Sequence, residues 1–296
     1  MASLKEVQSK IVSVKKTKQI TKAMNMVATS RLRGAQTSME AFRPYAEKFA
    51  EVLGSIADKA GDQASLLLTP REEVKKVHIV LLTSDRGLCG GFNFNLIEES
   101  EKLMKEKVAQ GLEVSFTNFG KKGRDYCRNK GMRRTREYLN VVGGKFDFSV
   151  ASTSGQELID GFLKGDFDEA YIIYAHFQGM ANQPPVTKQL LPIPAIEKSD
   201  IEKDEETEFM AEHIIEPSPE ELLNEMLPKN IFIQIYNALL ETSTSEHAAR
   251  MKAMDNATKA CNDMIDNLTL AYNKARQTAI TMELMDIVGG AEALKG

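Results

Sequence analysis

The two ends of this chain carry the pattern that most restricts its fold. From Leu4 to Phe42, steps of three and four residues meet an apolar side chain at nine of twelve positions. The same stepping from Met251 to Met282 gives a second, nearly continuous apolar seam. Such spacing is typical of a coiled coil, and helices of this length far exceed the average of about 11–12 residues. The sequence therefore predicts two long helices that pair antiparallel, with the rest of the chain as their connection.

The N-terminal seam has two irregularities. Lys18, Thr21 and Asn25 interrupt it with polar side chains, so the buried face is expected to drift around the helix. Pro44 lacks a backbone amide hydrogen and is expected to bend or briefly break the helix near Arg43.

The central part of the chain alternates between two kinds of pattern. Short apolar runs typical of strands cover 77–83, 112–120, 169–177 and 186–193, and helical patterns cover 93–111 and 152–166. Alternating strands and helices favour a mostly parallel sheet. We therefore expect a Rossmann-like α/β domain at 75–194, between long helices at 1–60 and 229–296. An acidic linker at 195–228 would connect the domain to the second helix.

Composition excludes several classes of protein. The 296 residues are 42% hydrophobic with a formal net charge of −4, as in an ordinary globular protein. Cys89, Cys127 and Cys261 lie far apart without a metal-binding spacing, which predicts reduced thiols and no metal site. No apolar run is long enough to span a membrane. The basic N-terminus could be a transit peptide, but its helical pattern continues past residue 40, which favours the long helix.

The segment "SDRGLCGGFN" at 84–93 raises the question of phosphate binding, because it follows a predicted buried strand and precedes a helix. A Walker loop requires a lysine and a hydroxyl residue after the glycines, and both are missing here. The spacing of Gly87, Gly90 and Gly91 also differs from the dinucleotide fingerprint. A small-anion site at the end of the strand remains an alternative to a tight turn that packs or contacts a protein.

Candidate catalytic and nucleic-acid residues are few. The four histidines His78, His176, His213 and His247 are scattered, without a Ser or Cys partner at a recognisable spacing. A basic cluster at 121–137 allows a nucleic-acid hypothesis, against which stand the acidic pI and the absence of a known binding motif. A solvated face or a contact with an acidic protein is the favoured interpretation.

The segment 279–294 is apolar at ten of sixteen positions, and these positions do not form one stripe. A helix that is apolar around most of its circumference needs to be buried. If the C-terminal helix is the longer of the pair, this tip extends past its partner and needs an apolar sleeve supplied by another protein.

Four blocks of the sequence resemble the gamma subunits of F-type ATP synthases. They are "SKIVSVKKTKQITKAMNMVATSRLR" (9–33), "SDRGLCGGFN" (84–93), "SEHAARMKAMDNATKAC" (245–261) and "YNKARQTAITMELMDIVGGAEAL" (272–294). They occur in the family's order and at its separations, and they include both ends of the chain. The segment 195–228 carries little of the resemblance.

The resemblance implies a central rotor shaft without catalytic residues, cofactor or metal. Its coiled coil would thread a hexamer of alpha and beta subunits, and its α/β domain would sit on the membrane c-ring beside the epsilon subunit. Rotation driven by ion flow would change the beta sites in turn, while the shaft itself binds neither nucleotide nor nucleic acid. The implied location is the cytoplasmic face of a bacterial inner membrane. A coiled-coil scaffold for nucleic acid and a nucleotide-dependent α/β enzyme remain as alternatives.

Several residues match family positions by motif. Lys22, Met24 and Arg250 resemble positions where the shaft meets an acidic lever of beta. Gln277, Thr281 and Glu283 resemble positions important for coupling near the upper bearing. Arg86 and Cys89 lie in the loop expected at the collar, facing protein. If Met24 and Arg250 lie at one level, Leu4 faces a residue near Leu270 and about two dozen residues stand beyond the pair.

Overall fold

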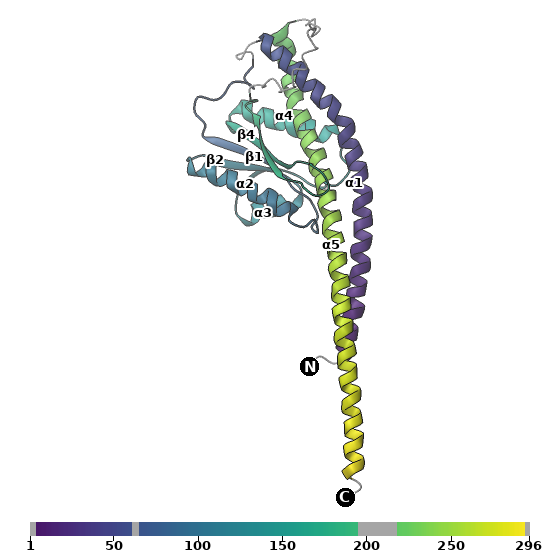
Figure 1. Cartoon of the computed structure of the whole chain (residues 1–296). Coiled ribbons are helices and arrows are strands. Elements are labelled where there is room, and N and C mark those ends of the chain that lie inside the picture. The colour runs from purple at the N-terminus through teal and green to yellow at the C-terminus, as the bar shows by residue number, and fades with distance from the viewer. Residues whose placement is uncertain (1–3, 61–64, 195–217, 294–296) are drawn as a thin grey trace, which may run out of the picture. The chain divides into compact units, whose positions relative to one another are not determined.

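A computed structural model describes residues 4–60, 65–194 and 218–293. Their contacts form two units, one built from 1–29 with 250–296 and the other from 30–249. The elements in chain order are α1 (Leu4–Ala60), β1 (Lys76–Leu82), α2 (Phe92–Ala109), β2 (Glu113–Phe119), α3 (Lys121–Asn129), β3 (Arg133–Tyr138), α4 (Phe148–Lys164), β4 (Glu169–Ala175), β5 (Pro185–Leu191) and α5 (Pro219–Ala293), as labelled in part in Figure 1.

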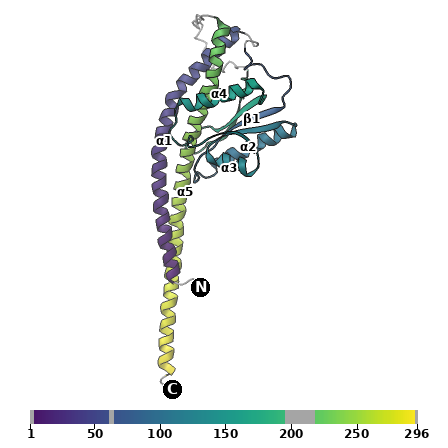
Figure 2. The ribbon, with the colours of Figure 1, turned by 180° about the vertical axis from the view of Figure 1, so that it is seen from behind.

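The first unit is an antiparallel pair of helical segments from α1 and α5, which lie side by side in both views (Figures 1 and 2). Asn25 Nδ2 donates to the carbonyl oxygen of Met251 at 2.8 Å, and Thr258 Oγ1 lies 2.8 Å from Thr21 Oγ1. Two of the three polar residues that interrupt the predicted seam, Thr21 and Asn25, therefore have partners across the pair. The predicted coiled coil is confirmed, and these two contacts place the register about two to five residues from the predicted alignment of Met24 with Arg250.

The second unit contains a five-stranded sheet in the order β3-β2-β1-β4-β5. The β1–β2, β1–β4 and β2–β3 pairs are parallel, and only the β4–β5 pair is antiparallel. The predicted α/β domain with a mostly parallel sheet is confirmed.

The two faces of this sheet are buried against different helices. One apolar cluster joins alternate residues of the central strands, such as Ile79 and Leu81, to α2 and α3. The other joins Val80 and Leu82 to α4 and to the parts of α1 and α5 in this unit. Because both faces are covered, consecutive residues of β1 from Val77 to Leu82 are buried, and all of them except His78 are apolar, as is usual in parallel strands.

The structure contains two elements that the sequence analysis did not expect, α3 and β3. α3 lies in the basic cluster 121–137, and β3 begins in it and ends one residue later, at Tyr138. β3 reads Arg-Arg-Thr-Arg-Glu-Tyr and is largely exposed at the sheet edge. An edge strand with one exposed side need not be apolar, and charged side chains protect such edges from unwanted pairing. Apolar periodicity therefore could not find it.

The expected linker boundary at 228 is also wrong, because α5 begins at Pro219. Ser218 caps this helix by accepting a hydrogen bond from the Glu221 amide, and Pro219 occupies the first helical position, where its missing N–H costs little. The helix then continues through Pro228, held by the fully buried Leu227 and Ile231. Residues 195–217 of the expected linker, including His213, lie outside the described residues.

The expected break at Pro44 is likewise absent, since α1 runs from Leu4 to Ala60. The turns after Pro44 are anchored by Leu53 and Ile56, which belong to the core of the second unit. This packing outweighs the one helical hydrogen bond that a proline removes.

Candidate functional site

The glycine-rich loop at 84–93 is closed by its own side chains. Asn93, in the first turn of α2, accepts from the Ser84 amide at 2.9 Å and donates to Cys89 Sγ at 3.1 Å. Cys89 is only 2% exposed, so its thiol supports the loop from within. The expectation that Cys89 faces a protein partner is therefore wrong for its side chain. Arg86 is exposed, and its contact with a partner stays a prediction.

Residues at the start of the same loop bind the N-terminus of α3. A helix N-terminus at the end of a parallel strand is a common place for an anion to bind. The amides of Lys121 and Gly123 donate to the side chains of Asp85 and Thr83, at 3.2 and 2.8 Å, and the Lys122 amide donates to the Ser84 carbonyl. These are the groups that would bind a phosphate at a helix N-terminus. Since the chain itself uses all three, this helix end is not an anion site.

The tip of the loop presents an apolar side chain to solvent. Leu88 is 61% exposed and has a φ of 65°, and Gly90 follows with a φ of 59°. A branched aliphatic residue in the left-handed region costs free energy and persists only where its surroundings enforce it. An exposed leucine held in this way is suited to contact with a protein surface.

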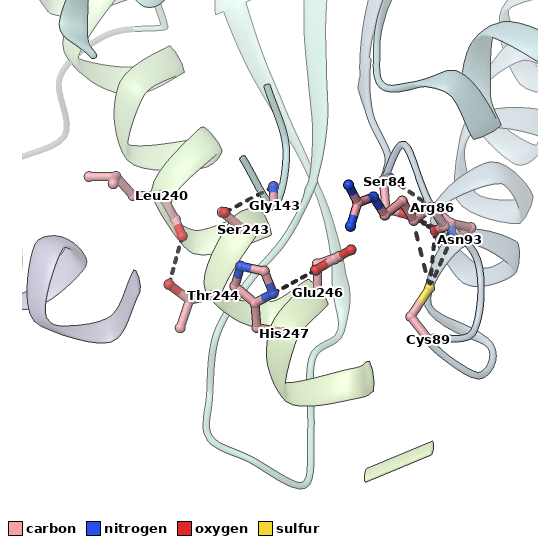
Figure 3. A network of polar contacts seen from close by, with 10 residues as sticks. All are labelled: Ser84, Arg86, Cys89, Asn93, Gly143, Leu240, Ser243, Thr244, Glu246 and His247. Atoms are coloured by element: carbon pink, nitrogen blue, oxygen red, sulfur yellow. Dashed lines mark hydrogen bonds and ion pairs between the residues drawn. The ribbon is translucent and has the colours of Figure 1, made fainter. Parts of the chain in front are cut away.

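A second polar feature lies on α5 next to this loop, and the sequence analysis missed it. All residues from Glu241 to His247 are buried, although each is polar. Figure 3 shows four of them, Ser243, Thr244, Glu246 and His247. Ser243 Oγ accepts from the Gly143 amide at 3.1 Å, and Thr244 Oγ1 donates to the Leu240 carbonyl at 2.8 Å. His247 Nδ1 lies 2.9 Å from a carboxylate oxygen of Glu246. The sequence signal was the uninterrupted polar run "ETSTSEH" inside a helix otherwise predicted to be amphipathic.

The residues predicted to act in coupling lie in the first unit. Met24 is 39% exposed, and Lys22, Gln277, Thr281 and Glu283 are exposed. Thr281 Oγ1 donates to the Gln277 carbonyl at 2.9 Å, so these two residues share one helical face, as their spacing predicts. Arg250 is half-buried in the same unit.

The basic cluster is partly neutralised within the chain. Five of the eight cations in 121–136 form ion pairs with acidic residues, and these are Arg124, Arg128, Arg133, Arg134 and Arg136. Pairing lowers the net field that would attract phosphates. The arrangement disfavours the nucleic-acid hypothesis.

His78 lines a cavity, but its contacts indicate a role in packing and not in catalysis. His78 lies under a cavity of about 330 Å³ between the sheet and α4, stacked on Phe167 at a centroid distance of 4.7 Å. Its two ring nitrogens lie 2.8 and 2.9 Å from the hydroxyls of Ser115 and Thr117. Burial lowers its pKa to about 4, so the ring is neutral at pH 7 with both nitrogens engaged.

The described residues offer neither a metal site nor a membrane span. They hold no group of three or more His, Cys, Asp or Glu side chains arranged to bind a metal ion. Within the same ranges, no helix is both long enough and apolar enough to cross a membrane.

Comparisons with known proteins give matches to one family along nearly the whole chain. A family profile described as ATP synthase matches residues 3–294. The chain is 68% identical over 298 residues to the ATP synthase gamma chain of Desulfosudis oleivorans, covering all of both proteins. It is 65% identical to that of Desulforapulum autotrophicum, covering 99% of this chain and all of the relative.

Solved structures share the fold at lower identity. The rotor of the Euglena gracilis mitochondrial ATP synthase contains a chain that matches with a TM-score of 0.65 at 20% identity, covering 94% of this chain and 98% of that one. A chain of the central stalk and c-ring structure of the Tetrahymena thermophila enzyme matches with a TM-score of 0.57 at 24% identity, covering 80% of this chain and 99% of that one.

Proposed function

The chain belongs to the gamma chains of ATP synthase, and from this premise we propose that it is the rotor shaft that couples ion-driven rotation of the membrane c-ring to conformational changes of the catalytic beta subunits. In this role it carries no catalytic residue. It acts by contact, since each orientation of an asymmetric shaft stabilises one set of open and closed beta states over the others.

The observation that carries the proposal is the exposed apolar end of α5. With Asn25 beside Met251 and Thr21 beside Thr258, Leu4 lies opposite a residue near 272–275, so α5 continues past the first described turn of α1. Six apolar side chains in this extension are between 50% and 71% exposed, and they are Ile280, Met282, Leu284, Met285, Ile287 and Val288. So large an apolar surface needs a partner. An apolar sleeve at the top of an alpha–beta hexamer would cover it.

Charge supports contact with beta along the lower part of the shaft. Lys15, Lys16 and Lys22 are exposed on α1 near Met24, and Lys18 among them is half-buried. This basic surface is complementary to an acidic lever on beta and would favour its approach. Lys22, Met24 and Arg250 are proposed to form that contact, and Gln277, Thr281 and Glu283 to lie near the upper bearing.

The proposed partners of the α/β domain are the epsilon subunit and the c-ring, which would place the chain at the cytoplasmic face of a bacterial inner membrane. The Arg86 loop is proposed to face the hexamer. Direct nucleotide binding by this domain is not part of the proposal, because the first amides of α3 are already used by Thr83, Ser84 and Asp85.

Co-expression with the matching alpha and beta subunits tests the proposal. The chain should co-purify with them as one complex, and ATP hydrolysis by that complex should exceed that of alpha and beta alone. Failure to form a complex, or equal hydrolysis without this chain, would show that the proposal is wrong.

A further inference from the structure

The buried run Glu241–His247 differs from the rest of the core of the second unit, which is mainly apolar. Seven consecutive residues turn through nearly two helical turns, so they point to all sides of α5. All seven are polar and all are buried. Buried polar groups are costly unless they are hydrogen-bonded. Thr244 and His247 are paired within α5, with the Leu240 carbonyl and with Glu246, so the other residues of the run depend on the surfaces around the helix.

The hydrogen-bond partners of Glu241, Thr242 and Ser245 lie at the carboxyl end of β4. Thr242 Oγ1 accepts from the Ala175 amide and Ser245 Oγ donates to the Ala175 carbonyl, both at 3.3 Å, so the last residue of β4 is held from both of its polar groups. Glu241 accepts from the Phe177 amide at 3.3 Å and from His176.

A third contact comes from the loop after β3. The Gly143 amide donates to Ser243, and Glu246 approaches the same glycine so closely that an added Cβ would lie 3.0 Å from its carboxylate. Gly143 has a φ of +73°, a conformation that favours glycine. Figure 3 shows Ser243 and Glu246 beside this loop, with Arg86 of the loop after β1 facing the same region.

These contacts lie where α5 passes from one face of the sheet to the other. Leu239 belongs to the apolar cluster on the α4 side of the sheet, whereas Ala249 packs against the cluster on the α2 side. Between them, α5 crosses the carboxyl edge of the sheet beside β4. In an open α/β sheet whose order changes direction between β1 and β4, this edge is where a ligand would bind. Here the helix fills that place.

We propose that Glu241–His247 act as a polar clamp that fixes the rotation and height of α5 against the sheet, so that turning force passes between the α/β domain and the shaft without slippage. An apolar contact tolerates small rotations of a helix, whereas hydrogen bonds are directional and weaken steeply when misaligned. The inference rests on the proposed rotor function. Thr242, Ser243 and Ser245 are positioning residues in it.

The test uses the complete ATP synthase in sealed vesicles. The double variant Thr242→Val/Ser245→Ala removes both contacts to Ala175 at nearly constant volume. The matched control is Thr37→Val/Thr269→Val, which removes two exposed hydroxyls, each of which donates to a carbonyl of its own helix. Two quantities are measured in each complex: amide hydrogen exchange of the peptide 169–177, and protons pumped per ATP hydrolysed.

The expected result for the clamp variant is exchange about tenfold faster at the end of β4, with protons pumped per ATP reduced by about half or more while hydrolysis continues. The control should match wild type in both quantities. If exchange rises and pumping per ATP is unchanged, the clamp does not transmit force. If exchange is unchanged, the contacts with Ala175 do not hold the strand.

A milder variant keeps the test decisive if the double variant does not assemble. Ser243→Ala removes only the bond to Gly143, and it is judged by the same two outcomes with exchange followed in the loop around Gly143. Failure of the rotor proposal itself would be separate, because wild-type complexes would then show no pumping that depends on this chain.

Discussion

At the scale of single residues, Met24 shows how an exposed side chain can be tested without disturbing the fold. It is 39% exposed on α1, beside Lys22 and one residue before the Asn25 contact with Met251. Its side chain therefore adds little to the stability of the helix pair, and its proposed role lies in the contact with beta.

Replacing Met24 by Lys should impair coupling more than folding. The variant adds a positive charge to a surface already rich in lysine, which would over-stabilise some beta states through the acidic lever. In vesicles, we expect ATP hydrolysis to continue while protons pumped per ATP fall by about half or more. Met264→Lys, at an exposed position of α5, is the control. Unchanged pumping per ATP in Met24→Lys would count against the proposed contact.

His78 gives a prediction about pH. Burial lowers its pKa from the ordinary histidine value of 6.5 to about 4, so between these values the unfolded chain binds a proton that the folded chain does not. Stability should therefore fall as the pH drops from about 6.5 toward 4. This one group accounts for a loss of about 2 kcal/mol between pH 7 and pH 5.

Unfolding of wild type and His78→Gln by urea at pH 7 and pH 5 measures this difference. The variant lacks the titrating ring but keeps His176 and His247, so its free energy of unfolding should change less by about 2 kcal/mol over the interval. Equal pH dependence in the two proteins would mean that His78 is accessible to protons in the folded state.

The sequence predicted residue features that depend on local geometry, and it missed those that depend on residues elsewhere in the fold. The shared face of Gln277 and Thr281 followed from their spacing and is confirmed, because helical geometry is local. The burial of Cys89 did not follow, since it depends on Asn93 and Ser84 folding back over the loop. The run Glu241–His247 was missed for the same reason: a polar sequence indicates exposure unless one knows which strand ends will match it.

At the scale of elements, glycine determines how closely α4 and α5 approach. A Cβ on Gly155 of α4 would lie 2.4 Å from Phe232 Cδ1 of α5, whereas a Cβ on Gly34 of α1 would meet nothing within 4 Å. Gly155 is therefore required for packing, while Gly34 only lowers the helix propensity of α1.

These two glycines allow a matched pair of substitutions. Gly155→Ala should lower the free energy of unfolding by about 1–3 kcal/mol, because the ring of Phe232 must move in a closed core. Gly34→Ala should instead raise it by up to about 1 kcal/mol, because alanine is the better helix former. Thermal unfolding followed by circular dichroism compares both with wild type, and a stabilised Gly155→Ala would refute the close approach of the two helices.

Element prediction succeeded where periodicity and burial coincide. The strands β1, β2, β4 and β5 and the helices α2 and α4 lie within a few residues of their predicted positions, because their apolar faces meet a core. β3 and α3 were missed because charged side chains dominate both. The start of α5 was missed because the Ser218–Pro219 start signal lies in an acidic segment that was assigned to a linker.

At the scale of the whole molecule, the C-terminal part of α5 keeps apolar side chains that the described part of the chain does not bury. Its apolar side chains are exposed at neighbouring positions around the helix, including Leu284, Met285, Ile287 and Val288. Surface of this kind marks an interaction site and promotes association in a free chain. The long helix is therefore adapted to surroundings that only an assembly provides.

Leu284→Glu/Ile287→Glu tests this dependence. Both side chains are more than half exposed, so the variant chain should keep its helix content and bind less of a dye that reports apolar surface. Its assembly with alpha and beta should weaken by about tenfold or more, because two charges would enter an apolar sleeve. Asn267→Glu/Thr269→Glu adds the same charge at two exposed polar positions of α5 that precede this tip, and it should assemble like wild type. If the tip variant assembled as well as this control, the end of α5 would not be enclosed by an apolar partner, and the observation that carries the rotor proposal would lose its force.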